Sequence, residues 1–284
     1  MKQLTSEPAV IGKKVDENLR LLVTTASQDL LEGLRRYDLW GRIGFMEIKR
    51  RYRRTVIGPF WSTISLAVLI AVMGTVGMGL WKQQPAEYVP FLASGMMVWL
   101  MLSTMITESC SLFINSQHLF SRIRMDYSIL AYALMWRNLI GFFHNLVVYL
   151  LVVLIFVPGL LNISILWIFP GLLLIALNSV WLALLLGTAC VRFRDIQQFV
   201  VTALQISLFV TPVFWPPQLL TGTTRYLFVD FNPLYCFIDV IRAPLLGKSP
   251  MLSSYAIILV VTLLGWLATF YLFSCFRKRI AFWV

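Results

Sequence analysis

Residues 138–191 read NLIGFFHNLVVYLLVVLIFVPGLLNISILWIFPGLLLIALNSVWLALLLGTACV, and no Asp, Glu, Lys or Arg occurs among them. The hydrocarbon core of a bilayer is ~30 Å thick and needs ~20 apolar residues for each helical crossing. The run is therefore long enough for two crossings. Pro158-Gly159, Asn162 and Pro170 lie near its middle, where such residues interrupt helices. The stretch predicts two membrane-spanning helices, at about 138–157 and 164–188.

Charge-free windows also occur on both sides of this stretch. They are residues 55–81, 88–107, 196–224 and 249–276. The whole chain is 59% hydrophobic and only 13% charged, against about a quarter charged in an ordinary soluble domain. The sequence predicts an all-α membrane protein with six transmembrane helices, at about 57–81, 89–109, 138–157, 164–188, 197–214 and 254–276.

The basic residues orient these spans, because short loops rich in Lys and Arg stay in the cytoplasm. With the N-terminus inside, the outer segments carry only four of the 24 Lys and Arg residues, namely Lys82, Arg225, Arg242 and Lys248. We therefore expect a multi-pass protein of a bacterial inner membrane, with a cytoplasmic or interfacial segment at 1–54, a transmembrane domain at 55–276 and a cytoplasmic tail at 277–284. The net charge of +11 then serves contact with anionic membrane lipids, and no nucleic-acid partner is expected.

The N-terminal segment shows apolar residues at helical spacing. Leu30, Leu34, Tyr37, Trp40 and Ile43 recur between arginines, which is typical of an amphipathic helix lying in the membrane interface. A soluble cap is the alternative. Glycines weaken helices, so a break is expected near the two glycines at 41 and 44.

A second short helix is expected before the last span. Asn232-Pro233 is typical of an N-cap followed by proline at the first helical position. An apolar stripe follows to residue 245, and Asp239 with Arg242 suggests an ion pair at i, i+3. The pattern predicts a helix at about 233–243 that re-enters the outer half of the membrane.

Groups that could perform chemistry are scarce. Gly247-Lys248-Ser249 lacks the earlier glycine of a phosphate-binding loop, and the two histidines have no neighbours at metal-ligand spacing. Glu108 is the sole carboxylate that could lie inside a span, and we expect it near the cytoplasmic end, either solvated or paired with an arginine. An ion-coupled carrier or channel would need more polar groups in the membrane, and a membrane-embedded transferase using lipid-linked sugars would need clustered acids. The chain is thus expected to be a transport subunit and not an enzyme, to bind no metal, and to be driven by another polypeptide.

Three motifs resemble those of type-2 ABC permeases that export polysaccharides. Residues 46–61, MEIKRRYRRTVIGPFW, are similar to the start of their first span, and 192–196, RFRDI, to their second inner loop. Residues 231–234, FNPL, with 238–242, IDVIR, resemble the segment before their last span. The resemblance implies a homodimer with two cytoplasmic ATP-binding subunits, which would hold ATP and Mg²⁺, moving a lipid-linked glycan outward. It favours O-antigen as cargo over capsule or teichoic acid.

The resemblance also suggests roles for individual residues. Arginine can grip phosphate oxygens bidentately, and aromatic faces pack against sugar rings. Contact with the diphosphate of a polyprenyl-linked glycan at the entrance is expected of Arg50, Arg51, Arg53 and Arg54. The candidates for lining the channel are Trp61, Phe91, Trp99, Phe199 and Phe214. Coupling to the ATP-binding subunit is expected of Leu119, Phe120, Arg122, Ile123, Arg124, Arg192, Arg194 and Asp195. The outer re-entrant segment would rest on Asn232, Pro233, Asp239 and Arg242.

Overall fold

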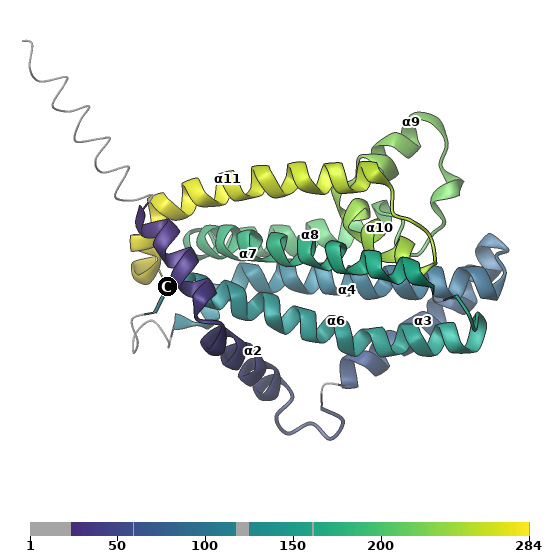
Figure 1. The fold of residues 1–284 in the computed structure, drawn as a ribbon, viewed down its shortest axis with the longest axis horizontal. Helices are drawn as coiled ribbons and strands as arrows, with labels where there is room; N and C mark the ends of the chain where they lie inside the picture. Colours follow the sequence, from purple (N-terminus) through teal and green to yellow (C-terminus); the bar gives the residue numbers. More distant parts are fainter. Residues whose placement is uncertain (1–23, 59, 118–124, 161, 284) are drawn as a thin grey trace, which may run out of the picture.

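The computed structural model describes residues 24–58, 60–117, 125–160 and 162–283, and within these residues the chain is helical, without a strand. A first helix covers residues 24–35. It is followed by α2 Tyr37–Arg51, α3 Phe60–Trp81, α4 Pro85–Asn115, α6 Ser128–Phe156, α7 Ile168–Arg192, α8 Asp195–Val210, α9 Gly222–Arg225, α10 Pro233–Leu245 and α11 Leu252–Trp283. Short turns of 3₁₀ helix cover Ile163–Trp167 and Pro217–Leu219, and a π-helical turn covers Tyr226–Asp230. The long helices lie roughly side by side, with α2 and the C-terminus at one end of the bundle and α9 and α10 at the other (Figure 1).

The bundle is built around α4. It packs against α3, α6, α7, α8 and α10, and 72% of its most apolar window is buried, against 22% for α3 and for α11. The outward faces of α3 and α11 nevertheless carry large apolar side chains such as Val72 and Leu263. Helices that are apolar all round but only partly covered by protein need a lipid environment. The bundle therefore belongs in a membrane.

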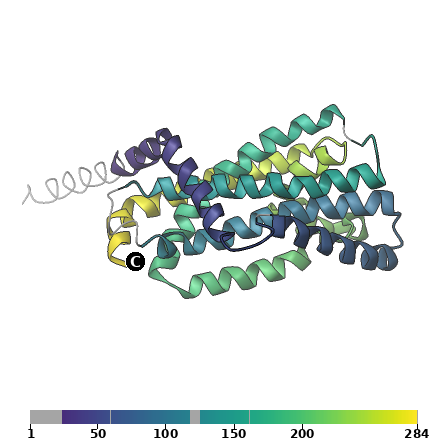
Figure 2. The same cartoon turned by 90° about the horizontal axis from the view of Figure 1, so that it is seen from below.

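Five of the described helices are long and apolar enough to cross a membrane. The fifth predicted span, at 197–214, corresponds to α8, which has only 16 residues and rises ~24 Å at ~1.5 Å per residue. No residue of α8 is buried, and it runs along the edge of the bundle in Figure 2. Six crossings therefore stay a prediction, because α8 alone falls short of the ~30 Å hydrocarbon layer.

Several helices extend beyond the charge-free windows that predicted them. α6 begins at Ser128, ten residues before the expected 138, and passes through Arg137. α4 continues past Glu108 to Asn115, and α11 continues to Trp283 through the segment expected to be a tail. A prediction based on uncharged windows places the end of a helix at the first charged residue. In the folded chain Glu108 and Arg137 pair inside the bundle, so both helices continue past them.

The N-terminal helix breaks at a different place from the one expected. The first helix ends at residue 35, Arg36 forms the break, and α2 begins at Tyr37 and runs through both glycines. A Cβ atom on Gly44 would lie 2.9 Å from the carbonyl oxygen of Ala133, whereas one on Gly41 would meet nothing within 4 Å. Gly44 therefore allows α2 to pack closely against α6. Tyr37, one of the apolar residues expected on the membrane-facing side, is 72% exposed on the protein surface. The position of this segment in the membrane interface stays a prediction.

The close approach at Gly44 makes a testable contrast with Gly41. Gly44→Ala is expected to destabilise the protein by about 1–3 kcal/mol, the usual range for overpacking, because the backbone of α6 must move. Gly41→Ala is expected to be neutral or to stabilise it by up to about 1 kcal/mol through helix propensity. Thermal unfolding of the two variants in detergent measures the difference. Equal midpoints would mean that α2 is not held against α6.

The short helix expected before the last span is present as α10, and its N-cap is confirmed. The Oδ1 atom of Asn232 accepts hydrogen bonds from the backbone N–H groups of Leu234 at 3.0 Å and Tyr235 at 3.3 Å. Pro233 occupies the first helical position. The location of α10 within the outer half of the membrane stays a prediction.

The expected ion pair between Asp239 and Arg242 is wrong, because the two side chains point to different neighbours. Asp239 accepts hydrogen bonds from the Ser254 hydroxyl at 2.7 Å and the Met251 N–H at 3.3 Å. Arg242 turns instead toward α4 and the end of α8. Pairs at i, i+3 form on exposed helix surfaces, whereas both of these side chains are buried.

Candidate functional site

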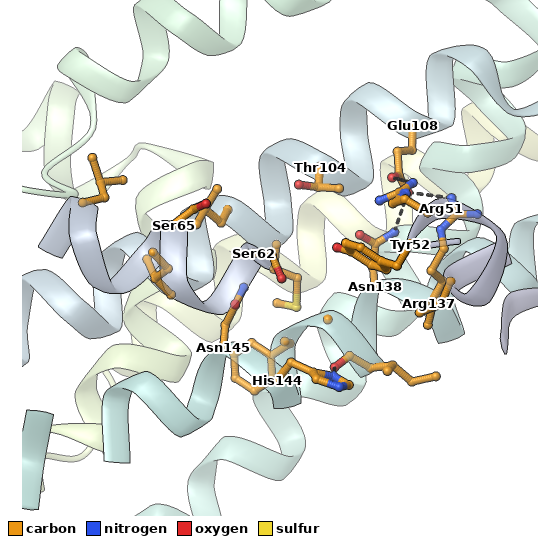
Figure 3. A pocket seen from close by; sticks show the side chains of 18 residues that line it. Arg51, Tyr52, Ser62, Ser65, Thr104, Glu108, Arg137, Asn138, His144 and Asn145 are labelled. Carbon is orange, nitrogen blue, oxygen red and sulfur yellow. Dashed lines mark hydrogen bonds and ion pairs between the residues drawn. The ribbon is translucent and has the colours of Figure 1, made fainter. Parts of the chain in front are cut away.

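A group of ionised side chains gathers where α2, α4 and α6 meet, toward the end of the bundle that carries α2. The carboxylate of Glu108 on α4 accepts a hydrogen bond at 2.6 Å from Arg137 on α6, and a second from Arg51 on α2. Asn138 donates to the same carboxylate at 3.4 Å. The other side of the Arg137 guanidinium is paired with Glu47. We call Glu47, Arg51, Glu108 and Arg137 the charge cluster, and Figure 3 shows Arg51, Glu108 and Arg137.

Local sequence explains how α2 supplies two members of this cluster. Glu47 and Arg51 are four residues apart, so both lie on the same face of the helix. From that face Glu47 reaches Arg137 of α6, and Arg51 reaches Glu108 of α4. Arg137 is only 12% exposed and Glu108 17% exposed at the side chain. Taking each ion out of water costs several kcal/mol unless a partner compensates it, and two carboxylates with two guanidinium groups leave the cluster without net charge.

A cavity of about 280 Å³ extends from the charge cluster along the bundle. Its polar lining includes Ser62 and Ser65 from α3, Thr104 from α4, and His144 and Asn145 from α6, as Figure 3 shows. The buried Oδ1 atom of Asn145 has no hydrogen-bond partner among the described residues. The cavity is therefore polar enough to hold water or the polar part of a ligand.

A larger surface cavity adjoins the first, and the two share Ile48, Tyr52, Ile140 and His144. It has a volume of about 1090 Å³ and lies between α2, the chain before α3, and α6. Its basic lining consists of Lys49, Arg50 and Arg53, and its apolar lining includes Ile43, Phe45 and Met46. Basic and apolar walls side by side can accept a molecule with an anionic head and a hydrocarbon tail.

Comparison with known proteins assigns the family. The family described as "ABC-2 type transporter" matches residues 42–246, more than half of the chain. The chain belongs to the ABC-2 type transporter family. Its relatives include an "O-antigen export system permease protein RfbA" from Myxococcus xanthus, 26% identical over 190 residues, which are 66% of this chain and 72% of the relative. A protein of the same description from Klebsiella pneumoniae is 22% identical over 202 residues, 70% of this chain and 76% of the relative.

The four arginines expected at the entrance are not gathered into one group in this ABC-2 chain. Arg51 is paired with Glu108, whereas Arg50 and Arg53 line the larger cavity. Arg54 follows α2 with a left-handed backbone (φ 73°) and is exposed. Only Arg50 and Arg53 thus combine an exposed guanidinium with the cavity wall.

The five aromatic residues proposed for the channel lie apart within the single ABC-2 chain. Trp99 is buried, and Trp61 and Phe199 are exposed on α3 and α8. Phe91 lies under the guanidinium of Arg242, and Phe214 packs on Trp81 and Phe209 near the same end. Because Trp99 is covered by its own chain, the five do not form one wall among the described residues.

Of the residues proposed to couple this transporter to its ATP-binding subunit, five lie outside the described residues. These are Leu119, Phe120, Arg122, Ile123 and Arg124. The other proposed site, Arg192 to Asp195, forms an exposed turn between α7 and α8. Arg192 lies 5.6 Å from the ring of Trp283, near the end of α11. The turn is therefore at the end of the bundle that carries α2 and the C-terminus.

Sequence reasoning missed Glu47, Arg137 and the polar lining of the smaller cavity. Arg137 directly precedes the charge-free window, so the span expected at about 138–157 leaves it out. The expected pairing of Glu108 with an arginine is confirmed, and the Glu47/Arg51 spacing on one helix face is the signal that could have found the rest of the cluster. In the parts of the chain that the structure describes, no three His, Cys, Asp or Glu residues gather as a metal site would require.

Proposed function

We propose that this chain is the membrane subunit of an ATP-driven exporter of lipid-linked polysaccharide, with O-antigen on a polyprenyl diphosphate as the favoured cargo. The ABC-2 family implies a cytoplasmic ATP-binding partner. The proposed assembly has two copies of each subunit and moves the glycan from the cytoplasmic to the outer side of a bacterial inner membrane. Membership of the family and the described function of the relatives support this proposal.

One structural observation supports it most directly, namely the larger cavity with its basic and apolar walls. A polyprenyl diphosphate has the same two chemistries, an anionic head and a hydrocarbon chain. Arg50 and Arg53 can donate charge-assisted hydrogen bonds to phosphate oxygens, while Phe45 and Met46 offer apolar surface to the isoprenoid. The larger cavity also shares wall residues with the smaller cavity that extends along the bundle.

Other cargoes and one other class remain as alternatives. Capsule and teichoic acid precursors share a lipid phosphate, so the cavity does not distinguish them from O-antigen. A transferase using lipid-linked sugars would need an available carboxylate as acid or base. Glu47 and Glu108 are each bound to arginine, which favours transport.

The proposal predicts that Arg50→Gln with Arg53→Gln weakens substrate binding. The concentration of lipid-linked glycan that half-maximally stimulates ATP hydrolysis should rise at least about tenfold, because one charged hydrogen bond contributes ~1.5 kcal/mol and ~1.4 kcal/mol is tenfold. The assay uses the chain and its ATP-binding subunit in lipid nanodiscs with a polyprenyl diphosphate glycan.

The matched control is Arg35→Gln with Arg42→Gln. Both arginines are exposed, and neither lines the cavity, so the same charge is removed from the same segment. We expect the control to behave as the unmodified complex. A similar loss in both double variants would show a general effect of charge, and no loss in the first would remove Arg50 and Arg53 from substrate binding.

A further inference from the structure

Asp29, in the first helix, is a buried carboxylate that joins three segments far apart in the sequence. Its side chain has no exposed surface. It accepts hydrogen bonds from the backbone N–H groups of Tyr127 at 3.2 Å and Ser128 at 3.0 Å. It also pairs with Arg277 of α11, whose Nε and Nη2 atoms lie 2.7 and 2.6 Å from its Oδ2. Four donor atoms from two other segments therefore converge on one carboxylate.

The first contact of Asp29 is with the beginning of α6. The N-cap residue of α6 makes no capping hydrogen bond with its own side chain, so Asp29 supplies that cap from another helix. A carboxylate there satisfies N–H groups that have no partner within the helix and favourably meets the positive end of the helix dipole. The Ser128 hydroxyl in turn donates to the Asp29 carbonyl oxygen at 2.6 Å. The first helix is thus fixed to the first turn of α6.

The second contact of Asp29 is with the end of α11. Arg277 uses two nitrogens on one carboxylate oxygen, and its guanidinium also lies 5.8 Å from the ring of Tyr127. The Tyr127 ring packs edge to face on Phe113 of α4 and on Phe273 of α11. Charge and aromatic contacts therefore join α11 to the residues just before α6.

We propose that Asp29 and Arg277 are positioning residues that make the start of α6 and the end of α11 move together. This inference rests on the proposed function, in which a cytoplasmic ATP-binding subunit drives the chain. A displacement of Met125 and Asp126, the described residues just before Tyr127, acts directly on Tyr127 and Ser128, and the Asp29 carboxylate passes it to α11 through Arg277. Without this link, ATP hydrolysis would move α6 alone and less glycan would be exported for each ATP.

The test compares Arg277→Gln, Arg277→Lys and Arg279→Gln in the complex with the ATP-binding subunit, reconstituted in liposomes. Arg277→Gln should leave co-purification of the subunits and basal ATP hydrolysis within about twofold of the values for the unmodified complex. It should lower the amount of glycan exported per ATP hydrolysed at least about fivefold. Arg277→Lys keeps the charge, and its export per ATP should be at least half of that of the unmodified complex. Arg279→Gln is the control, because Arg279 is exposed and bears the same charge two residues away.

A second measurement does not depend on the cargo. Hydrogen exchange of peptides covering 125–132 and 270–283 is followed with and without ATP. In the unmodified complex, both peptides should change together, and in Arg277→Gln only the first should change. Coupled changes in Arg277→Gln, or equal losses of assembly, ATP hydrolysis and export, would overturn the inference. If the unmodified complex couples the two peptides but moves no lipid-linked glycan, the proposed function fails and the link stands.

Discussion

Replacement of Arg242 by alanine is expected to lower the free energy of unfolding by about 3 kcal/mol. Arg242 is 3% exposed, and its guanidinium donates to the backbone carbonyl oxygens of Pro212 and Val213, both at 2.8 Å. These carbonyls have left the regular helix after α8, and losing the donor costs ~1–3 kcal/mol for each buried acceptor. Relief of the buried charge offsets part of this cost. Equilibrium unfolding in detergent measures the change.

Two further substitutions at Arg242 separate its contributions, and one at Tyr88 gives a comparison with a single hydrogen bond. Arg242→Met refills most of the volume without a donor, so it should recover only the packing on Phe91, which lies 4.1 Å from the guanidinium carbon. Arg242→Lys keeps the charge but loses the planar fork of donors. Its free energy of unfolding should lie between those of the Met variant and the native protein. Tyr88→Phe removes one hydrogen bond, at 2.7 Å to the Phe214 carbonyl, and should cost only about 1 kcal/mol. Native stability of the Met variant would contradict a net contribution from the hydrogen bonds.

Arg137→Met is expected to destabilise the protein by about 3–5 kcal/mol, the range for a buried ion pair that loses one partner. The change leaves Glu47 without its partner and Glu108 with Arg51 alone, beside an apolar side chain. Because Arg137 also forms part of the wall of the 280 Å³ cavity, export should fall with stability. Thermal unfolding and ATP-driven export in liposomes measure the two effects.

A double variant and a surface pair test the origin of that cost. Arg137→Met with Glu47→Gln should recover part of the stability, because the carboxylate that Arg137→Met leaves without a partner is gone, whereas Glu108 keeps Arg51. Arg225→Met is the control: Arg225 pairs with Asp230 at 3.8 Å in a partly exposed position, and such pairs contribute less than about 1 kcal/mol. If Arg225→Met cost as much as Arg137→Met, burial of the charge cluster would not explain its importance.

The amino-acid sequence by itself determined that the chain is helical and belongs in a membrane. Long apolar windows have only this solution, because backbone groups in lipid must be paired within the segment. Local signals also determined the N-cap of α10, since Asn232 and Pro233 act on the turn that they begin. The basic residues predicted the orientation, which rests on charge counts alone.

Only the tertiary structure decided which charges end a helix and which lie inside the bundle. Glu108 and Arg137 are 29 residues apart and stay within α4 and α6 because each compensates the other. Asp239 and Arg242 are three residues apart and do not pair, because the neighbours of α10 offer each of them a different partner. Asp29 and Arg277, 248 residues apart, meet only when the ends of the chain are packed together. The electrostatic cost of burial depends on three-dimensional neighbours, so spacing along the sequence could not have predicted these contacts.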